Sequence, residues 1–181
     1  KAVQLHLRTL AMAHAVVEVS VGNDAGDDVT FLLAANPGSP PLPLTKVASG
    51  GELARTMLSL RLVLTEGPAT LVFDEVDAGI GGEAAVAVAG ALAQLGQRHQ
   101  VLVVTHLAQV AAAAHRQIKV SKTVKSKQTF AEASEVGAQD RVQEIARMLS
   151  GGMAEEAAQN YASELLKASN VRSSGQGRSR R

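Results

Sequence analysis

The fold of this chain is decided by residues 46–55, which read KVASGGELAR. Ser49 is a favourable helix N-cap, and Glu52 stands three positions later, which is the spacing of a capping box. Beyond Ser49 the apolar residues recur at the period of a helix, with Glu52, Arg55 and Ser59 on another face. These apolar residues are Leu53, Met57, Leu60 and Leu64. The sequence therefore predicts a helix that begins directly after Ser49.

Two glycines, Gly50 and Gly51, occupy the first turn of this helix. Each costs up to about 1 kcal/mol relative to alanine, so capping alone does not account for them. Glycines are favourable there when a ligand must approach the backbone closely. A helix N-terminus with free N–H groups and a serine hydroxyl is also a typical phosphate site. This stretch alone is consistent with phosphate binding and with simple capping.

A strand, a helix and a second strand follow. Residues 70–73 (TLVF) and 101–104 (VLVV) are short apolar runs typical of buried strands, and the first comes after the breaker Gly67-Pro68. Residues 82–95 between them are rich in alanine and long enough for a helix. This order predicts a βαβ unit with two parallel, neighbouring strands.

Polar residues stand at the end of each predicted strand. Asp74 and Glu75 follow the first strand, and Thr105 and His106 end the second run. The carboxyl ends of parallel strands meet at one edge of a sheet, where open α/β sheets bind ligands. An acid pair beside a histidine suits Mg²⁺ binding and general-base chemistry. The sequence therefore predicts a functional site at this edge.

These stretches together resemble the motifs of ABC-type ATPases. Residues 49–52 (SGGE) are similar to the ABC signature, residues 71–75 (LVFDE) to Walker B with its following glutamate, and residues 76–79 (VDAG) to the D-loop. His106 resembles the H-loop histidine.

Longer stretches, spread over roughly residues 10–168, resemble the RecN family of SMC-like ATPases, which are bacterial DNA-repair proteins. They are residues 31–38 (FLLAANPG), 46–53 (KVASGGEL), 72–82 (VFDEVDAGIGG), 104–111 (VTHLAQVA) and 147–152 (RMLSGG). The VFDEVDAGIGG match is highly specific, whereas SGGE alone is a weak signal. Ala108 is a departure, because proline is expected there.

The resemblance implies an α/β fold, namely the C-terminal lobe of an ABC/SMC-type P-loop ATPase head. Such a lobe has a mainly parallel sheet flanked by helices, with accessory β-hairpins. Residues 1–13 are then expected to be the end of a coiled-coil arm, residues 14–170 the lobe, and residues 171–181 a disordered basic tail.

The resemblance also assigns roles to single residues. Asp74 is expected to hold Mg²⁺, directly or through water, and Glu75 to orient or deprotonate the attacking water. His106 would contact the γ-phosphate, and Asp77 would couple the two sites of a dimer. The signature residues would reach the nucleotide held by the other protomer, with N–H groups stabilising its charge. They are Ser49, Gly50, Gly51 and Glu52.

One expected element is missing, because no G-x-x-x-x-G-K-[ST] occurs in the chain. In RecN-like and SMC-like proteins this Walker A motif lies in an N-terminal lobe, beyond a long coiled coil. The chain alone is therefore expected to be inactive as an ATP hydrolase. The implied partners are that N-terminal lobe, a second head in a homodimer and DNA, with ATP and Mg²⁺ as cofactors. The implied function is recombinational repair of DNA double-strand breaks.

Composition sets further bounds. Hydrophobic residues make up 46% of the 181 residues and aromatics 2%, which predicts a core of Ala, Val and Leu. A net charge of +1 predicts no strong attraction of the whole domain to nucleic acid. No apolar run reaches about 18 residues, so no membrane partner is expected. Because the first residue is Lys1 and no signal peptide pattern is present, we expect a fragment of a cytoplasmic, nucleoid-associated protein.

Two hairpins are expected outside the motifs. One pairs residues 15–21 with residues 29–33, before an extended connection at residues 36–43. The second follows a strand at residues 117–120 and turns at residues 125–127. Its lysines, which either contact DNA phosphates or, as we favour, solvate an edge strand, are Lys119, Lys122, Lys125 and Lys127. Helices are expected at residues 136–149 and 154–166.

Three alternatives remain at this stage. Residues 79–84 (GIGGEA) fit a dinucleotide-binding G-x-G-x-x-A, but residues 84–131 contain no acid for the ribose. A transporter ATPase, or another SMC-like branch, is a second alternative, although transporter signatures usually end in Gln where Glu52 stands. A lobe that serves only in dimerisation is the third, and the presence of both Asp74 and Glu75 disfavours it.

Overall fold

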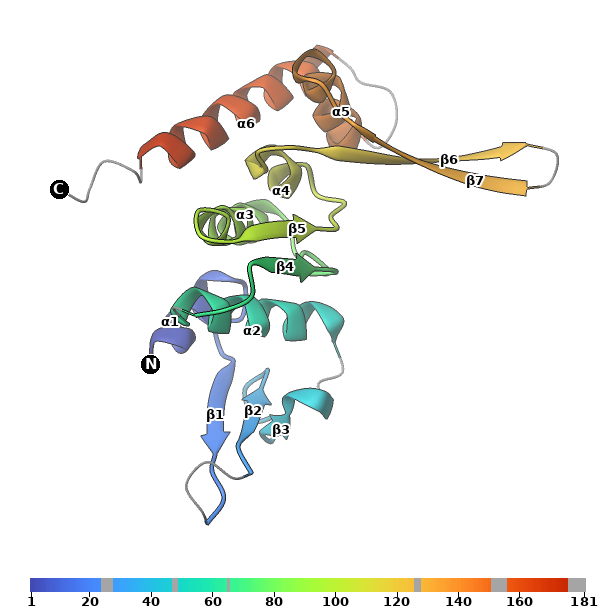
Figure 1. Cartoon of the computed structure of the whole chain (residues 1–181). Helices are drawn as coiled ribbons and strands as arrows, with labels where there is room; N and C mark the ends of the chain where they lie inside the picture. Colours follow the sequence, from blue (N-terminus) through green and yellow to red (C-terminus); the bar gives the residue numbers. More distant parts are fainter. Residues whose placement is uncertain (24–27, 47–48, 65, 126–127, 151–155, 176–181) are drawn as a thin grey trace. The chain divides into compact units, whose positions relative to one another are not determined.

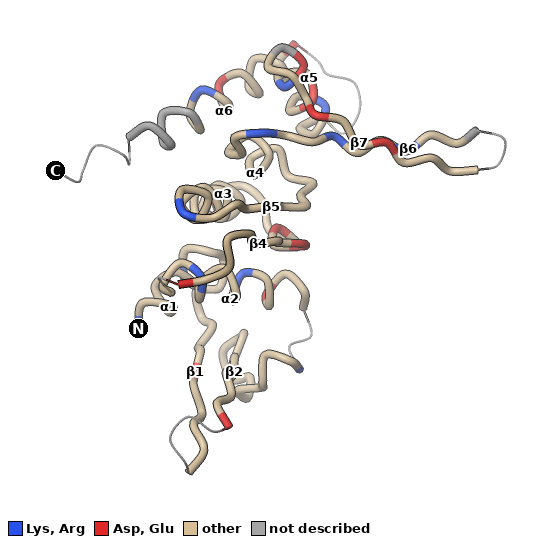
Figure 2. Tube along the Cα trace, in the orientation of Figure 1, with Lys and Arg blue, Asp and Glu red and all other residues tan. Residues whose placement is uncertain are grey.

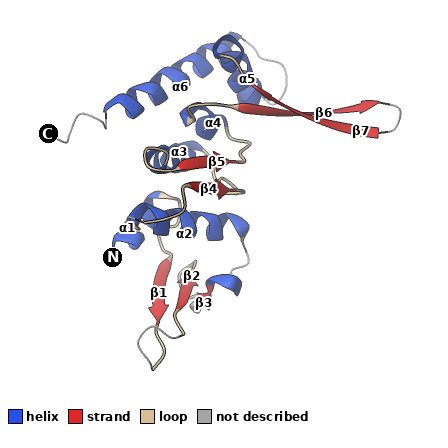
Figure 3. Ribbon diagram, viewed as in Figure 1, coloured by secondary structure: helices blue, strands red, loops and turns tan. Residues whose placement is uncertain are grey.

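In the computed structural model of this chain, the described residues are 1–23, 28–46, 49–64, 66–125, 128–150 and 156–175. The chain divides into two compact units, Lys1–Thr105 and His106–Arg181. Figure 1 follows the elements of both units along the chain, and Figure 3 distinguishes helices from strands. No helix in the described ranges is long and apolar enough to cross a membrane.

The first unit opens with a helix and a small antiparallel sheet of order β1-β2-β3. A core of Leu7, Met12, Ala15 and Leu33 joins the helix to the sheet. The expected strand pair is confirmed, and the predicted extended connection contains a third strand. The helix is shorter than expected from residues 1–13, because Ala11 has a φ of 60°. The elements are α1 (Ala2–Thr9), β1 (Val16–Ser20), β2 (Thr30–Ala34) and β3 (Leu42–Pro43).

The predicted signature helix is confirmed as α2 (Gly50–Val63), which follows a 3-10 turn at Leu44–Lys46. Ser49 is its N-cap in extended conformation. The Ser49 hydroxyl accepts a hydrogen bond from the Glu52 N–H at 3.4 Å. The cap satisfies one of the free donors at the helix start.

The buried side of α2 differs from the predicted leucine stripe. Arg55 is 6% exposed and Ser59 is fully buried, whereas Met57 of the stripe is 38% exposed. Leu53 and Met57 instead line an open groove beside the strand that follows. The helix thus buries polar and small residues together with Leu58 and Leu62, and leaves part of the predicted apolar stripe uncovered in the described part of the chain.

The predicted βαβ unit is confirmed. It comprises β4 (Thr70–Phe73), α3 (Gly82–Leu95) and β5 (Gln100–Val103), and the strands are parallel with Phe73 opposite Val103. Phe73 is 6% exposed, whereas Val72, on the opposite face of the strand, is 67% exposed. Parallel strands are normally covered on both faces. In the described residues this parallel sheet has two strands, and one of its faces carries exposed valine.

The second unit is a small helical cluster with a long hairpin. Its core consists of Ala108, Ala111, Ala112, Ile145, Ala146 and Ala162. The predicted strand and hairpin are one continuous ribbon, in which Ile118 pairs with Glu135 and Lys125 with Gln128. The short helix at the start of this unit, α4, was not predicted from the sequence. The elements are α4 (Ala108–Ala113), β6 (Ile118–Lys125), β7 (Gln128–Glu135), α5 (Ala138–Ser150) and α6 (Glu156–Gly175).

Two expectations concern the charged parts of this unit. Both signs of charge occur along the hairpin (Figure 2), and Lys119 forms an ion pair with Glu144 at 3.0 Å. This contact supports a structural role for Lys119 over one in DNA contact, whereas Lys127 lies outside the described residues. α6 continues to Gly175, past residue 171 where we expected a disordered tail to begin, and residues 176–181 lie outside the described residues.

Candidate functional site

The site begins at the turn that follows β4. Asp74 and Glu75 are both exposed there. Glu75 has a φ of 56°, which is the left-handed region that residues other than glycine seldom adopt. The turn is closed by the Ala78 N–H, which donates to the Glu75 carbonyl at 3.0 Å. Such backbone conformations cost energy and are concentrated at functional sites, so the position of the Glu75 side chain is set by the turn.

The Glu75 carboxylate lies against the start of α2. A Cβ atom on Gly50 would collide with Oε2 of Glu75, so this approach depends on glycine. The N-terminus of a helix attracts negative charge, whether from a carboxylate or from a phosphate. The structure therefore brings Glu75 next to the capped, glycine-rich start of α2. The sequence predicted these two features from separate stretches of the chain.

The next glycine permits a second contact. A Cβ atom on Gly51 would lie 2.9 Å from the Ala78 carbonyl oxygen and 3.0 Å from Nη1 of Arg55. Without that atom, Nη1 of Arg55 donates to the Ala78 carbonyl at 2.9 Å and to the Val76 carbonyl at 3.4 Å. Burial lowers the pKa of Arg55, and the nearby Glu52 carboxylate opposes that shift. α2 and the predicted D-loop are thus joined by a buried guanidinium.

Asp77 lies between the two carbonyls that Arg55 binds. Its side chain is 2% exposed and accepts a hydrogen bond from the Thr105 hydroxyl at the end of the β5 segment. The resemblance implied that Asp77 couples the two sites of a dimer, and in this structure the residue is buried within its own unit. Its role toward a second protomer stays a prediction.

His106 is the first residue of the second unit, and its side chain is exposed. It stands directly before Leu107, which is the N-cap of α4. The far end of α4 is held by Arg141, whose Nη2 donates to the carbonyls of Ala111 at 3.0 Å and of Ala112 at 3.3 Å. Arg141 therefore fixes the short helix that follows the histidine.

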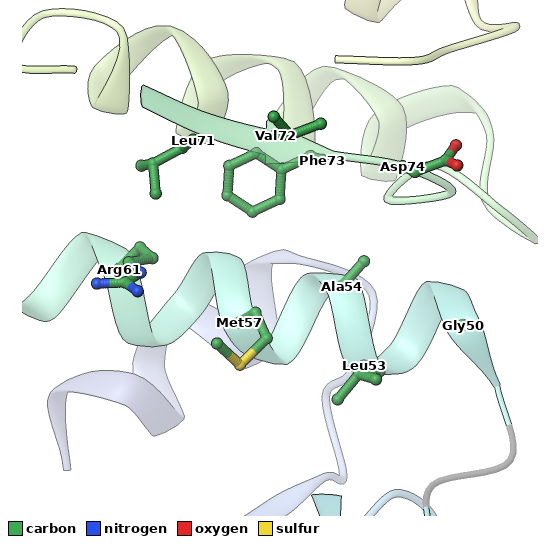
Figure 4. Close-up of a pocket in the computed structure, with 9 residues that line it drawn as sticks. All are labelled: Gly50, Leu53, Ala54, Met57, Arg61, Leu71, Val72, Phe73 and Asp74. Carbon is green, nitrogen blue, oxygen red and sulfur yellow. The ribbon is translucent and has the colours of Figure 1, made fainter. Parts of the chain in front are cut away.

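A groove in the first unit separates α2 from β4 (Figure 4). It has a volume of about 360 Å³ and ends at Gly50 and Asp74. The side chains of Leu71 and Phe73 point from β4 toward α2, and Asp74 lies at the strand end. No group of three acids or histidines that could hold a metal occurs among the described residues. Asp74 would therefore need further Mg²⁺ ligands from a nucleotide, water or another part of the protein.

Comparisons with known proteins show which proteins the chain resembles. No protein-family model matches the chain. Over 166 residues, or 88% of this chain, it is 48% identical to the DNA repair protein RecN of Deinococcus radiodurans, of which it covers 29%. It is 43% identical to RecN of Streptomyces coelicolor over 91% of this chain and 32% of that relative. The chain is similar to one segment of RecN. It spans about a third or less of the length of these RecN relatives.

Solved structures agree on the fold. The chain matches an SMC head domain with a coiled coil from Pyrococcus yayanosii with a TM-score of 0.58 and 17% identity, over 80% of this chain and 28% of that one. A structure from work on the ATP-driven dimerization of SMC ATPases matches with a TM-score of 0.51 and 16% identity, over 82% of this chain and 91% of that one. The predicted α/β fold of an SMC-type ATPase head is confirmed.

Two residues of the site were missed at the sequence level, Arg55 and Thr105. Arg55 was assigned only to a face of the helix away from the leucines. The available signal was the small residues at its i−4 and i+4 positions, Gly51 and Ser59, which leave room for a large side chain on that face. For Thr105, position at a strand end was the only signal.

Proposed function

We propose that this chain is the C-terminal half of the ATPase head of a RecN-type protein that acts in recombinational repair of DNA double-strand breaks. In the complete protein, ATP would be bound and hydrolysed at the interface between two heads. Asp74, Glu75 and Ser49 would each supply part of a site. The observation that carries this proposal is the exposed acid pair after β4, which lies beside the capped, glycine-lined start of α2.

Each residue has a role that its position supports. The Glu75 carboxylate is exposed and would orient the attacking water and accept its proton. The hydroxyl of Ser49 and the N–H groups of Gly50 and Gly51 would stabilise negative charge on the phosphates of a nucleotide held by the second head. His106, which is exposed before α4, would contact the γ-phosphate.

Mg²⁺ would neutralise phosphate charge, and Asp74 is the residue of this chain that would hold it. One or two carboxylates with phosphate oxygens and water are a usual ligand set for Mg²⁺. A single exposed aspartate at a strand end fits that set, because the nucleotide and water supply the remaining ligands.

The missing half of the site would come from the N-terminal lobe of the same protein. That lobe would supply the Walker A phosphate cradle, which this sequence lacks. The uncovered face of β4, where Val72 is 67% exposed, supports such a partner, because parallel strands are buried on both faces in complete α/β domains. DNA and a second head complete the proposed partners, at the bacterial nucleoid.

A mixing experiment with the complete protein tests whether the site is shared between heads. Ser49→Arg places a bulky cation at the positive end of α2 and should abolish turnover while the protein still binds ATP. A variant without the Walker A lysine should also be inactive. Mixed dimers should regain partial ATPase activity, because one site then has an intact Walker A from the Ser49→Arg head and an intact Ser49 from the other.

Two controls make the result decisive. Ser49→Ala removes the cap without added bulk, and should cost about 1 kcal/mol of stability. Ser39→Arg adds the same cation at an exposed position in the connection before α2 and should leave turnover unchanged. Both mutants must first be shown to be folded and to pair. If such mutants then recover no ATPase activity on mixing, Ser49 does not act across a dimer.

A further inference from the structure

Arg55 stands out because its charge is buried and its guanidinium donates to backbone carbonyls, while the nearby Glu52 carboxylate acts on it only through charge. It is 6% exposed, and its guanidinium bonds are to the backbone carbonyls of Val76 and Ala78. Its Nε finds no acceptor among the described residues. A buried charge is costly, and an apolar side chain of similar size would often give a more stable protein at such a position. The guanidinium instead offers directed hydrogen bonds, which an apolar side chain does not.

The hydrogen bonds of Arg55 fix the backbone on both sides of Asp77. Val76 and Ala78 are the two neighbours of Asp77, so one side chain from α2 binds the backbone on both sides of the D-loop aspartate. Asp77 is in turn bound through its carboxylate by Thr105. The D-loop therefore lies between two hydrogen-bonded supports within the first unit, one from α2 and one from the end of the β5 segment.

The start of α2 and its contact with the D-loop are separated by fewer than two helical turns. Ser49 caps the helix and Arg55 is six positions further along, while Gly51 lets the helix approach Ala78 closely. A helix moves as a rigid element over this distance. A displacement of Ser49 by a ligand would therefore be carried through Arg55 to the backbone around Asp77.

We propose that Arg55 is a positioning residue that couples the Ser49 end of α2 to Asp77, and so couples the two ATP sites of a head dimer. This inference rests on the proposed function. Arg55 would not touch ATP, and its loss should leave nucleotide binding intact. It should instead lower the rate of turnover and remove cooperativity between the sites.

The test uses the complete protein and three variants. Arg55→Met removes the hydrogen bonds and keeps an unbranched side chain, and Arg55→Lys keeps the charge but reaches one carbonyl at a time. Ser59→Ala is the matched control, because Ser59 is on the same buried side of α2 and its hydroxyl donates within the helix, to the Arg55 carbonyl. The measurements are melting temperature, equilibrium binding of ATP, kcat, KM and the Hill coefficient of ATP turnover.

We expect wild-type turnover to be cooperative. Arg55→Met should bind ATP within about twofold of wild type and lose about tenfold in kcat, with a Hill coefficient near 1, because a charge-assisted hydrogen bond changes a rate by roughly one order of magnitude. Arg55→Lys should lose about threefold in kcat, and Ser59→Ala should match wild type. This pattern would support the inference, since a purely structural role would change stability and ATP affinity together.

Several results would overturn it. Wild-type kcat and Hill coefficient in folded Arg55→Met would do so, as would a loss of kcat that tracks a loss of ATP affinity. If Arg55→Met does not fold, Arg55→Lys decides, and wild-type values in that variant would count against the inference. Non-cooperative turnover by the wild type would also overturn it while leaving the proposed function intact. The absence of any ATP turnover by the complete wild-type protein would instead contradict the proposed function itself.

Discussion

Glu75 in the first unit and Glu144 in the second are placed in opposite ways. Glu75 is exposed, has a φ of 56° and lies against Gly50 at the start of α2. Glu144 lies within α5, and its side chain is 7% exposed. Glu144 accepts hydrogen bonds from Arg147 at 2.6 and 2.9 Å and forms an ion pair with Lys119 at 3.0 Å. One carboxylate is held in place by an unfavourable backbone conformation and the other by cationic partners.

The difference is the one expected between the acid that we propose to be reactive, Glu75, and a structural acid, Glu144. A carboxylate with strong cationic hydrogen bonds is a poor base, because those bonds stabilise its charged form. Accordingly, the hydrogen bond from Arg147, with a smaller contribution from Lys119, lowers the pKa of Glu144 even though its burial opposes that shift. An exposed carboxylate at a strand end is free to meet water and a nucleotide. The contrast predicts that substitution of Glu75 changes turnover and that substitution of Glu144 changes stability.

The largest effect is expected for Glu75→Gln in the complete protein. ATP binding should be kept, because the amide preserves the shape of the side chain. Turnover should fall by at least about 100-fold, because an amide does not accept the proton of the attacking water. Steady-state ATPase assays and equilibrium ATP binding measure the two quantities. Glu144→Gln is the matched control and should retain wild-type kcat, and wild-type turnover in Glu75→Gln would remove that residue from the mechanism.

A smaller effect, on stability alone, is expected for Glu144→Gln. The amide weakens the bonds to Arg147 and Lys119 and leaves both cations near a neutral side chain. The free energy of unfolding of this chain at neutral pH should fall by about 1–3 kcal/mol, the usual range for hydrogen bonds to charged groups. Urea unfolding measures it, with Glu75→Gln as the control that should unfold like wild type.

The pH dependence of that difference gives a stricter test. Because the folded pKa of Glu144 is lowered from its ordinary value of 4.5, the unfolded chain takes up the proton first as the pH falls. The stabilisation is therefore fully present above the unfolded pKa and is lost as the pH falls through the folded pKa. The difference in unfolding free energy between wild type and Glu144→Gln should shrink over that range. A difference that stays constant with pH would show that the ion pairs of Glu144 do not stabilise the fold.

The features that sequence alone predicted are those with local causes. The Ser49 cap and the start of α2 depend on residues within one helical turn, and β4, α3 and β5 follow from two apolar runs separated by an alanine-rich stretch of helix length. The burial of Arg55 depends on carbonyls more than 20 positions away in the chain, which no local pattern reveals. The exposed acids Asp74 and Glu75 were predicted from their place at a strand end. The left-handed conformation of Glu75 was not, since glutamate gives no signal for it.

That conformation provides the smallest and most specific prediction. Glu75→Ala should leave the strain of the left-handed backbone in place, whereas Glu75→Gly should relieve it, because glycine adopts positive φ without steric cost. The glycine variant of this chain should therefore be more stable than the alanine variant by about 0.5–1 kcal/mol, even after glycine's larger loss of backbone entropy on folding is included. Urea unfolding of both variants measures the difference. Glu18 in β1 is the matched control, because it is an exposed glutamate in ordinary strand conformation, and there the glycine variant should be the less stable of the two. The same order of stabilities at both positions would mean that the turn after β4 holds Glu75 without strain, and that the carboxylate reaches Gly50 through its side-chain conformation alone.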